Sequence, residues 1–280
     1  MGAQTPHAAG LAANGKDCLL PINLDTLLRD TMRALGFLTR LPVAAKWFDG
    51  DDGKLTTTAR AFPLAGAIAS LPGIAVIVAG TLLDQPLLLT GVLTAMVQTA
   101  VGGGLHEDGL ADVADGLFGG QDKARRLEIM KDSRIGTYGA ITLAFALAIR
   151  TITIAAILQA GLLAAALSLL GSQALARSAM VWHWTNLPPA KSDGVAANSG
   201  QPDEASTHFA LASGIGIALA AALFARGAIP ALIGLALAAG ATYVFRQLCN
   251  RKIAGYTGDT LGASAVLAEL AFLTGLASGL

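Results

Sequence analysis

The sequence predicts an all-α fold: a polytopic integral membrane bundle of about seven transmembrane helices, preceded by an amphipathic helix. Hydrophobic residues make up 54% of the 280 positions, and charged residues make up only 14%. The mean hydropathy is +0.59. Several apolar runs reach about 20 residues, the length at which an α-helix crosses the hydrocarbon core of a bilayer. Soluble proteins of this size do not usually carry several such runs.

The N-terminal region divides into an extension and the first helix of the fold. Residues 1–20 lack the basic and apolar segments of a cleavable signal and are expected to form a disordered extension, which leaves 21–280 as a single membrane-embedded domain. The segment 23–42, NLDTLLRDTMRALGFLTRLP, places leucines near helical spacing, with charged residues elsewhere. This helix either lies on the membrane surface or packs against the bundle.

The seven spans are assigned from the apolar runs and the polar stretches between them. One long polar stretch, 183–207, is rich in Pro, Gly and Asn and marks a connection between helices. The expected spans are 62–83, 86–104, 138–158, 161–182, 209–225, 228–248 and 262–280.

Basic residues then fix the orientation of these spans. With seven spans, one side of the membrane receives 17 of the 19 Lys and Arg residues, and the exceptions are Arg226 and Arg150. This asymmetry is typical of the cytoplasmic side. The formal net charge is zero, so no overall field attracts nucleic acid. Cys18 and Cys249 lie far apart and indicate neither a disulfide framework nor a zinc site.

An acidic segment, LHEDGLADVADGLFGG at 105–120, lies between two apolar runs. Asp108, Asp112 and Asp115 follow the spacing i, i+4, i+7, so a helix would present them on one face. Mg²⁺ binds through a few carboxylates and leaves its other positions to water and phosphate oxygens. Gly109 and Gly116 are expected to leave this surface open to a bulky ligand. The alternative is a solvated segment whose acids cap helix ends.

A basic cluster follows in QDKARRLEIMKDSRIGTYG, residues 121–139. Acids that hold a metal beside cations that hold oxyanions form a suitable site for a diphosphate. Some of these cations are ordinary cytoplasmic-side residues, and Asp132 is either a fourth metal ligand or the partner of Arg134. The cations of the cluster are Lys123, Arg125, Arg126, Lys131 and Arg134.

Further polar residues lie on the same side or at membrane depth. The island GYTGDTLGA at 255–263 contributes candidate substrate-binding residues Thr257, Asp259 and Thr260. His106 is either a hydrogen-bonded structural residue or a group that contacts substrate. Arg177 lies near a helix end, where it can join an anion site.

Two ionisable residues lie inside predicted spans. Charged side chains at membrane depth are costly and usually functional. Glu269 lies two to three turns into the last span, and Arg150 either pairs with it or extends toward the membrane surface.

These motifs resemble those of the cobalamin synthase family, the adenosylcobinamide-GDP ribazoletransferases. GGLHEDGLADVADGL and RRLEIMKDSRIGTYG carry most of the resemblance, and it extends from about residue 24 to the C-terminus. Glu107 stands where the family is expected to have an apolar residue. The supporting matches are GFLTRLP, RAFPLAGA, ALARSAM and GYTGDTLGA.

The resemblance implies a Mg²⁺-dependent, multi-pass enzyme of cobalamin (vitamin B12) biosynthesis in the bacterial inner membrane, with its active site facing the cytoplasm. Such enzymes join adenosylcobinamide-GDP to α-ribazole or its 5′-phosphate and release GMP. Domain 21–280 is then catalytic. A homo-oligomer or an association with other corrinoid-pathway enzymes is also compatible with the resemblance.

The expected mechanism is attack by an alcohol on a diphosphate. Asp108, Asp112 and Asp115 would bind Mg²⁺, while Lys131 and Arg134 would neutralise the leaving GMP. His106 or a carboxylate would take the proton of the hydroxyl. Two alternatives are a membrane prenyltransferase with an Asp-rich Mg²⁺–diphosphate site and an ion-coupled transporter, whose ion site would be expected near the bilayer midplane.

Overall fold

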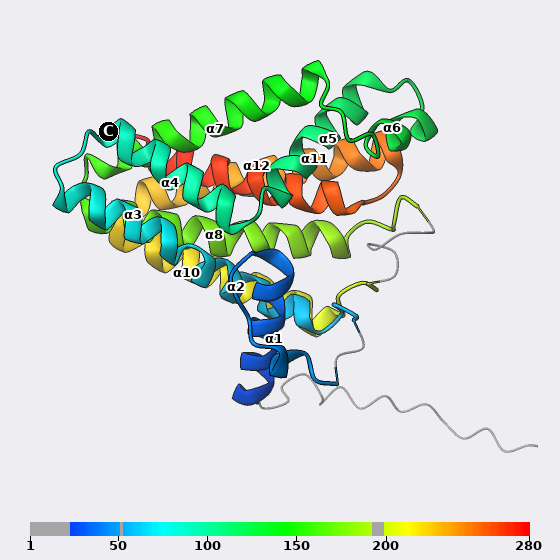
Figure 1. Ribbon diagram of the computed structural model, residues 1–280, viewed down its shortest axis with the longest axis horizontal. Coiled ribbons are helices and arrows are strands. Elements are labelled where there is room, and N and C mark those ends of the chain that lie inside the picture. The colour runs from blue at the N-terminus through cyan, green and yellow to red at the C-terminus, as the bar shows by residue number, and fades with distance from the viewer. Residues whose placement is uncertain (1–22, 51–52, 192–198) are drawn as a thin grey trace, which may run out of the picture.

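The computed structural model describes residues 23–50, 53–191 and 199–280, and these are arranged as a helical bundle (Figure 1). The described ranges contain no strand, although an isolated β-bridge joins Pro189 and Tyr256. The expected extension 1–20 lies outside the described residues. The α-helices are α1 Leu24–Leu38, α2 Phe62–Ala69, α3 Leu71–Leu82, α4 Leu87–Val101, α5 Leu105–Gly119, α6 Lys123–Ile129, α7 Thr137–Leu158, α8 Leu162–Thr185, α10 Glu204–Arg226, α11 Ala228–Ile253 and α12 Gly258–Leu276. Two 3₁₀ helices are η1 Ala45–Phe48 and η2 Thr58–Ala61.

Six helical segments in the described part of the chain are long and apolar enough to cross a membrane. They confirm six of the predicted spans, and the polytopic helical bundle is therefore confirmed. The segments are Thr58–Leu82, Thr137–Leu158, Leu162–Thr185, Glu204–Arg226, Ala228–Ile253 and Gly258–Leu276.

The remaining predicted span, 86–104, forms the short helix α4. After α4 the chain bends by 90° into α5, and a seventh span exists only if this bent pair is counted as one. Gly103 and Gly104 have φ angles of +64° and +72°, a left-handed conformation that glycine adopts readily. The turn therefore depends on the glycine run that precedes the acidic segment. We treat α5 as a helix packed against the spanning helices rather than as a span.

The centre of the bundle is formed by α8 and α12. In the most apolar stretch of these two helices, 72% and 78% of the residues are buried. The corresponding share is 28% in both α10 and α11, which therefore face the lipid. Small residues let the helices approach closely. Gly275 of α12 lies against the backbone of Gly234 in α11, where a Cβ atom would collide.

Helix α1 packs against the bundle, which is one of the two arrangements expected for it. It lies across the direction of the long helices (Figure 1), and its Ala34 and Leu35 are buried in the core. Buried Asp30 accepts a hydrogen bond of 2.7 Å from Arg60 Nε and ties α1 to η2. Leu24 on its outer side is 77% exposed. The helix thus packs on the bundle through one face, and its position on a membrane surface stays a prediction.

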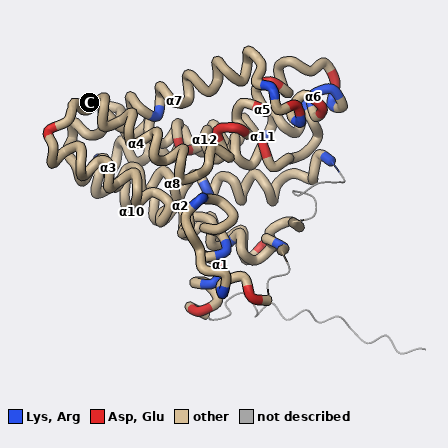
Figure 2. The backbone as a smooth tube through the Cα atoms, in the orientation of Figure 1, with Lys and Arg blue, Asp and Glu red and all other residues tan. Residues whose placement is uncertain are grey.

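Charged residues are distributed unevenly over the molecule (Figure 2). They gather at the end that holds α5 and α6 and around α1 below the bundle, whereas the end where α3 and α4 meet is mostly uncharged. The polar end of the bundle holds the predicted site.

Candidate active site

Helix α5 carries the predicted row of carboxylates. Asp108 is exposed, while Asp112 and Asp115 are half-buried. Asp259, in the first turn of α12, lies opposite this row. A Cβ atom added to Gly109 would lie 2.8 Å from the carbonyl oxygen of Asp259, so the two helices meet there backbone to backbone. The helical placement of the row is confirmed.

The two glycines of α5 have a different role from the one expected. Gly109 packs against Asp259, and Gly116 packs against Met130, whose Cγ would lie 2.5 Å from an added Cβ atom. Both positions are filled by neighbouring parts of the chain. The expectation that they leave room for a bulky ligand is therefore wrong, and they instead allow close packing.

The carboxylates of this site repel one another. Burial, followed by the nearby charges of Asp108, Asp259 and Asp115, raises the pKa of Asp112 from 3.8 to about 7. No described residue forms a hydrogen bond or ion pair with the side chain of Asp108 or Asp112. A cation placed between these oxygens would reverse the repulsion, so the donor set fits a hard divalent metal.

Asp115 is engaged differently from the other two acids. Its Oδ2 and Oδ1 atoms accept hydrogen bonds of 2.7 and 2.9 Å from the backbone N–H groups of Gly136 and Gly139, at the start of α7. This carboxylate therefore holds the N-terminus of α7. Among the described residues, no group of three or more His, Cys, Asp or Glu side chains is arranged to hold a metal ion. The ligand set Asp108, Asp112 and Asp115 stays a prediction.

A cavity of about 440 Å³ opens beside Asp108 and Asp259. Its polar side also contains Lys131 and Lys191, and Lys191 interacts electrostatically with Asp259. The rest of the lining is mainly apolar and includes four Phe, Trp and Tyr side chains. These apolar residues include Phe37, Leu38, Leu55, Phe62, Met180, Trp184 and Tyr256.

Segments from two distant parts of the chain line the cavity together. The backbone N–H of Ala190 donates to the carbonyl of Tyr256 at 2.8 Å, and the N–H of Tyr256 donates to the carbonyl of Pro188 at 2.9 Å. These bonds join the segment after α8 to the segment before α12. They bring Lys191 and Thr257 into the lining of the same cavity.

Comparison with known proteins identifies the family. Residues 30–277 match the family model described as cobalamin-5-phosphate synthase. The chain belongs to the cobalamin-5-phosphate synthase family. No solved structure matches the chain.

Curated relatives of this synthase family cover nearly the whole chain, and each is described as adenosylcobinamide-GDP ribazoletransferase. One from Rhizobium etli (strain ATCC 51251 / DSM 11541 / JCM 21823 / NBRC 15573 / CFN 42) is 48% identical over 90% of this chain and 97% of its own length. One from Sinorhizobium sp is 47% identical over 89% and 95%. One from Brucella anthropi is 42% identical over 91% and 99%. The resemblance noted in the sequence is thus confirmed.

In this member of the synthase family, only some of the predicted basic side chains line the cavity. Lys131 lines it. Arg134 is exposed and pairs with Asp132, with Nη2 and Oδ2 2.7 Å apart. Arg125 forms an exposed pair with Glu128 at 2.8 Å. The side chains of Arg125, Asp132 and Arg134 do not line the cavity. Substrate contacts by these three residues stay predictions.

The residues predicted in the 255–263 island also differ in whether they line the cavity. Thr257 and Asp259 line the cavity. Thr260 is fully buried and forms a reciprocal capping box with Thr257 at the start of α12. Its observed contacts are therefore those of a residue that fixes the helix start beside Asp259.

His106 lies between the cavity and a small polar chamber of about 10 Å³. The ring is buried, and neither of its nitrogens has a hydrogen-bond partner among the described residues. Arg177 lines the chamber rather than the cavity, and its Nη1 donates to Gln173 Oε1 at 2.8 Å. The chamber is large enough for about one water molecule.

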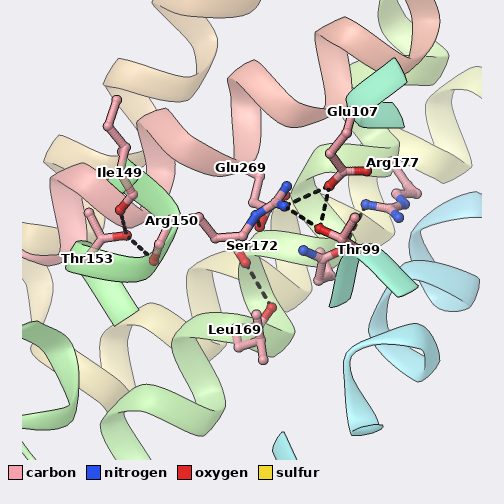
Figure 3. Close-up of polar contacts among 10 residues, drawn as sticks. Thr99, Glu107, Ile149, Arg150, Thr153, Leu169, Ser172, Arg177 and Glu269 are labelled. Carbon is pink, nitrogen blue, oxygen red and sulfur yellow. Dashed lines mark hydrogen bonds and ion pairs between the residues drawn. The ribbon is translucent and has the colours of Figure 1, made fainter. Parts of the chain in front are cut away.

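A buried ion network borders this chamber (Figure 3). Arg150 of α7 donates from Nε and Nη2 to the two carboxylate oxygens of Glu269 at 2.9 and 2.8 Å. Its Nη1 donates to Glu107 Oε1 at 2.7 Å and to Thr99 Oγ1 at 3.3 Å. The predicted pair of Arg150 and Glu269 is confirmed. Glu107 supplies the second carboxylate.

Several cavity residues were absent from the sequence-based set, among them Lys191, Trp184 and Tyr256. The paired prolines before Lys191 mark a rigid turn, but no spacing relates that turn to α5. Trp184 and Tyr256 are buried, with ring centroids 6.3 Å apart, and resemble ordinary core aromatics in the sequence. The tertiary fold alone brings them to the site.

Proposed function

We propose that the protein is an adenosylcobinamide-GDP ribazoletransferase, which joins adenosylcobinamide-GDP to α-ribazole or its 5′-phosphate and releases GMP. The observation that carries the proposal is that relatives described by this name match about nine-tenths of the chain at up to 49% identity. The cavity supports it, because acidic, basic and aromatic surfaces meet there.

The two sides of the cavity would receive different parts of the substrates. Lys131 and Lys191 provide point charges for diphosphate oxygens. Phe37 is 44% exposed and offers apolar ring surface to a flat aromatic base, while the buried rings of Trp184 and Tyr256 belong to the same cavity lining. A diphosphate bound at the polar side would then lie beside Asp108 and Asp259, while a base is held against the rings.

The residues that would hold Mg²⁺ are Asp108 and Asp112, with Asp259 facing them from α12. A bound magnesium ion would neutralise charge on the diphosphate oxygens. Asp115 would contribute by fixing the start of α7 and hence the carboxylate row. Lys131 would stabilise the departing GMP phosphate from the cavity wall.

The proton of the attacking ribazole hydroxyl needs an acceptor at the cavity. Asp108 lines the cavity and has no partner among the described residues. His106 lines it with two unpartnered ring nitrogens. Asp108 is the exposed candidate and His106 is the buried one. The pH profiles of GMP release by Asp108→Asn and His106→Gln distinguish them.

We further propose that the protein lies in the bacterial inner membrane with this cavity on the cytoplasmic side. The gathering of charged residues at the cavity end supports that orientation, since basic residues favour the cytoplasmic side (Figure 2). Association with a second copy or with other corrinoid-pathway enzymes stays a prediction.

The test is release of GMP by the full chain reconstituted in lipid vesicles. We expect GMP only when adenosylcobinamide-GDP, α-ribazole and Mg²⁺ are all present. Prenyl diphosphates and transported ions are the matched alternative substrates. Release of diphosphate from a prenyl donor, or ion flux without GMP release, would replace the proposal with a prenyltransferase or a transporter.

A further inference from the structure

A second, apolar groove lies on the lipid-facing part of the bundle. Its volume of about 500 Å³ falls within the range of small-ligand pockets. None of its described lining residues belongs to the candidate active site. The groove lies over α8 and α12, with α10 and α11 as its walls, and the lining residues are Leu175, Ser178, Ala179, Trp182, Leu211, Ile215, Leu235, Ala238, Ala239, Thr242, Tyr243 and Ala268.

The hydroxyl groups deep in this groove are already satisfied. Ser178 Oγ donates to the carbonyl of Ala210 at 2.8 Å. Thr242 Oγ1 donates to the carbonyl of Ala238 at 2.8 Å. Because both hydroxyl hydrogens are donated to helix backbone, Ser178 and Thr242 offer no free donor, and the groove away from Trp182 and Tyr243 presents hydrocarbon surface. Such a surface favours an apolar occupant over water or a polar ligand.

One end of the groove has a different chemistry. Trp182 and Tyr243 line it, and Tyr243 is 54% exposed. Arg246 lies one turn beyond Thr242 and Tyr243 on α11, with its guanidinium carbon 5.7 Å from the centre of the Trp182 ring. Its Nη2 donates to the carbonyl of Asn186 at 2.8 Å. A fixed cation, a Trp and a Tyr are the side chains that membrane proteins place at the level of lipid headgroups.

We propose that this groove is a phospholipid site, in which one acyl chain lies between α10 and α11 and the phosphate lies beside Arg246. The occupant must join a hydrocarbon chain to an anion at one end, which a phospholipid does. The groove walls belong to the two spanning helices that are least buried, so bilayer lipid reaches them directly. The site is independent of the proposed reaction.

The test measures lipid bound to the purified full chain by native mass spectrometry. The added probes are phosphatidylglycerol and diacylglycerol, which has the same chains without the phosphate. We expect one phosphatidylglycerol to remain bound to the unaltered protein. The bound amount of phosphatidylglycerol should exceed that of diacylglycerol. Ala239→Trp fills the groove from an exposed position and should lower the bound lipid by about tenfold or more.

A matched variant provides the control. Ala220→Trp makes the same change at an exposed position of α10 that does not line the groove, and it should retain the lipid. Arg246→Gln should abolish the preference for phosphatidylglycerol over diacylglycerol. Equal retention of lipid by Ala239→Trp and Ala220→Trp would overturn the proposal. So would a lipid-free dimer that Ala239→Trp dissociates, because the groove would then be an interface between copies.

Discussion

Gly109 of α5 faces the backbone of Asp259, and this contact joins the two acidic elements of the site. An added Cβ atom would lie 2.8 Å from the Asp259 carbonyl oxygen and 2.9 Å from its Cα atom, both of them backbone atoms that cannot move independently. The distance between the α5 carboxylates and Asp259 therefore depends on a glycine at this position.

Gly109→Ala should reduce GMP release more than it reduces folding. The new methyl group must push the start of α12 away from α5, and a displacement of about 1 Å can lower a rate by about 10²-fold. Steady-state kinetics in vesicles would measure the loss. Gly119→Ala is the control, since its Cβ atom would meet Ile129 Cδ1 at 3.7 Å, an ordinary contact. Similar activities of the two variants would contradict this role of Gly109.

Arg150→Gln should destabilise the bundle strongly. The substitution leaves Glu107 and Glu269 buried without their cation, and breaking a buried ion pair from one side costs about 3–5 kcal/mol. Thermal denaturation in detergent would show the loss. Arg125→Ala breaks only the exposed pair with Glu128 and should cost about 0–1 kcal/mol. Comparable melting temperatures for the two variants would argue against a stabilising network.

Much of this arrangement follows from the sequence, because it depends on local periodicity. The apolar runs predict the spanning helices, and the spacing of Asp108, Asp112 and Asp115 predicts their helix. Pairing of Arg150 with Glu269 is one of the two alternatives that the sequence offers for Arg150, because charged side chains at membrane depth are costly without a partner.

The remaining features depend on contacts between distant segments. The 90° turn after α4 brings Glu107 toward Arg150, and no periodicity encodes that angle. Lys191 reaches the cavity through the bridge between Pro189 and Tyr256. Arg125 and Arg134 pair with acids three and two residues away, so their charges are satisfied locally and outside the cavity.

Asp112→Asn and Asp115→Asn should separate metal binding from helix capping. Asp112→Asn should lower GMP release by about 10³-fold with little loss of stability, because it removes an unpaired charge at the diphosphate site. Asp115→Asn should lower both activity and melting temperature, because one oxygen accepting from Gly136 or Gly139 becomes a donor. Activity and melting curves recorded on the same preparations would show the difference. A fully active Asp112→Asn variant would exclude this carboxylate from the site.

The stability of the metal-free protein should fall as the pH rises from about 4 to 7. An unperturbed Asp side chain, as in the unfolded chain, has a pKa of 3.8. In the fold the pKa of Asp112 is raised to about 7, because burial and neighbouring acids disfavour its charge. Between these values the folded chain binds more protons than the unfolded chain, so raising the pH removes stability. Melting temperatures in a chelator at pH 5 and 7.5 would measure the slope. Asp112→Asn should flatten that slope, whereas Glu204→Gln, an exposed change at the start of α10, should leave it unchanged. If the slope of Asp112→Asn matched that of the unaltered protein, the repulsion among these acids would have to be relieved without a metal.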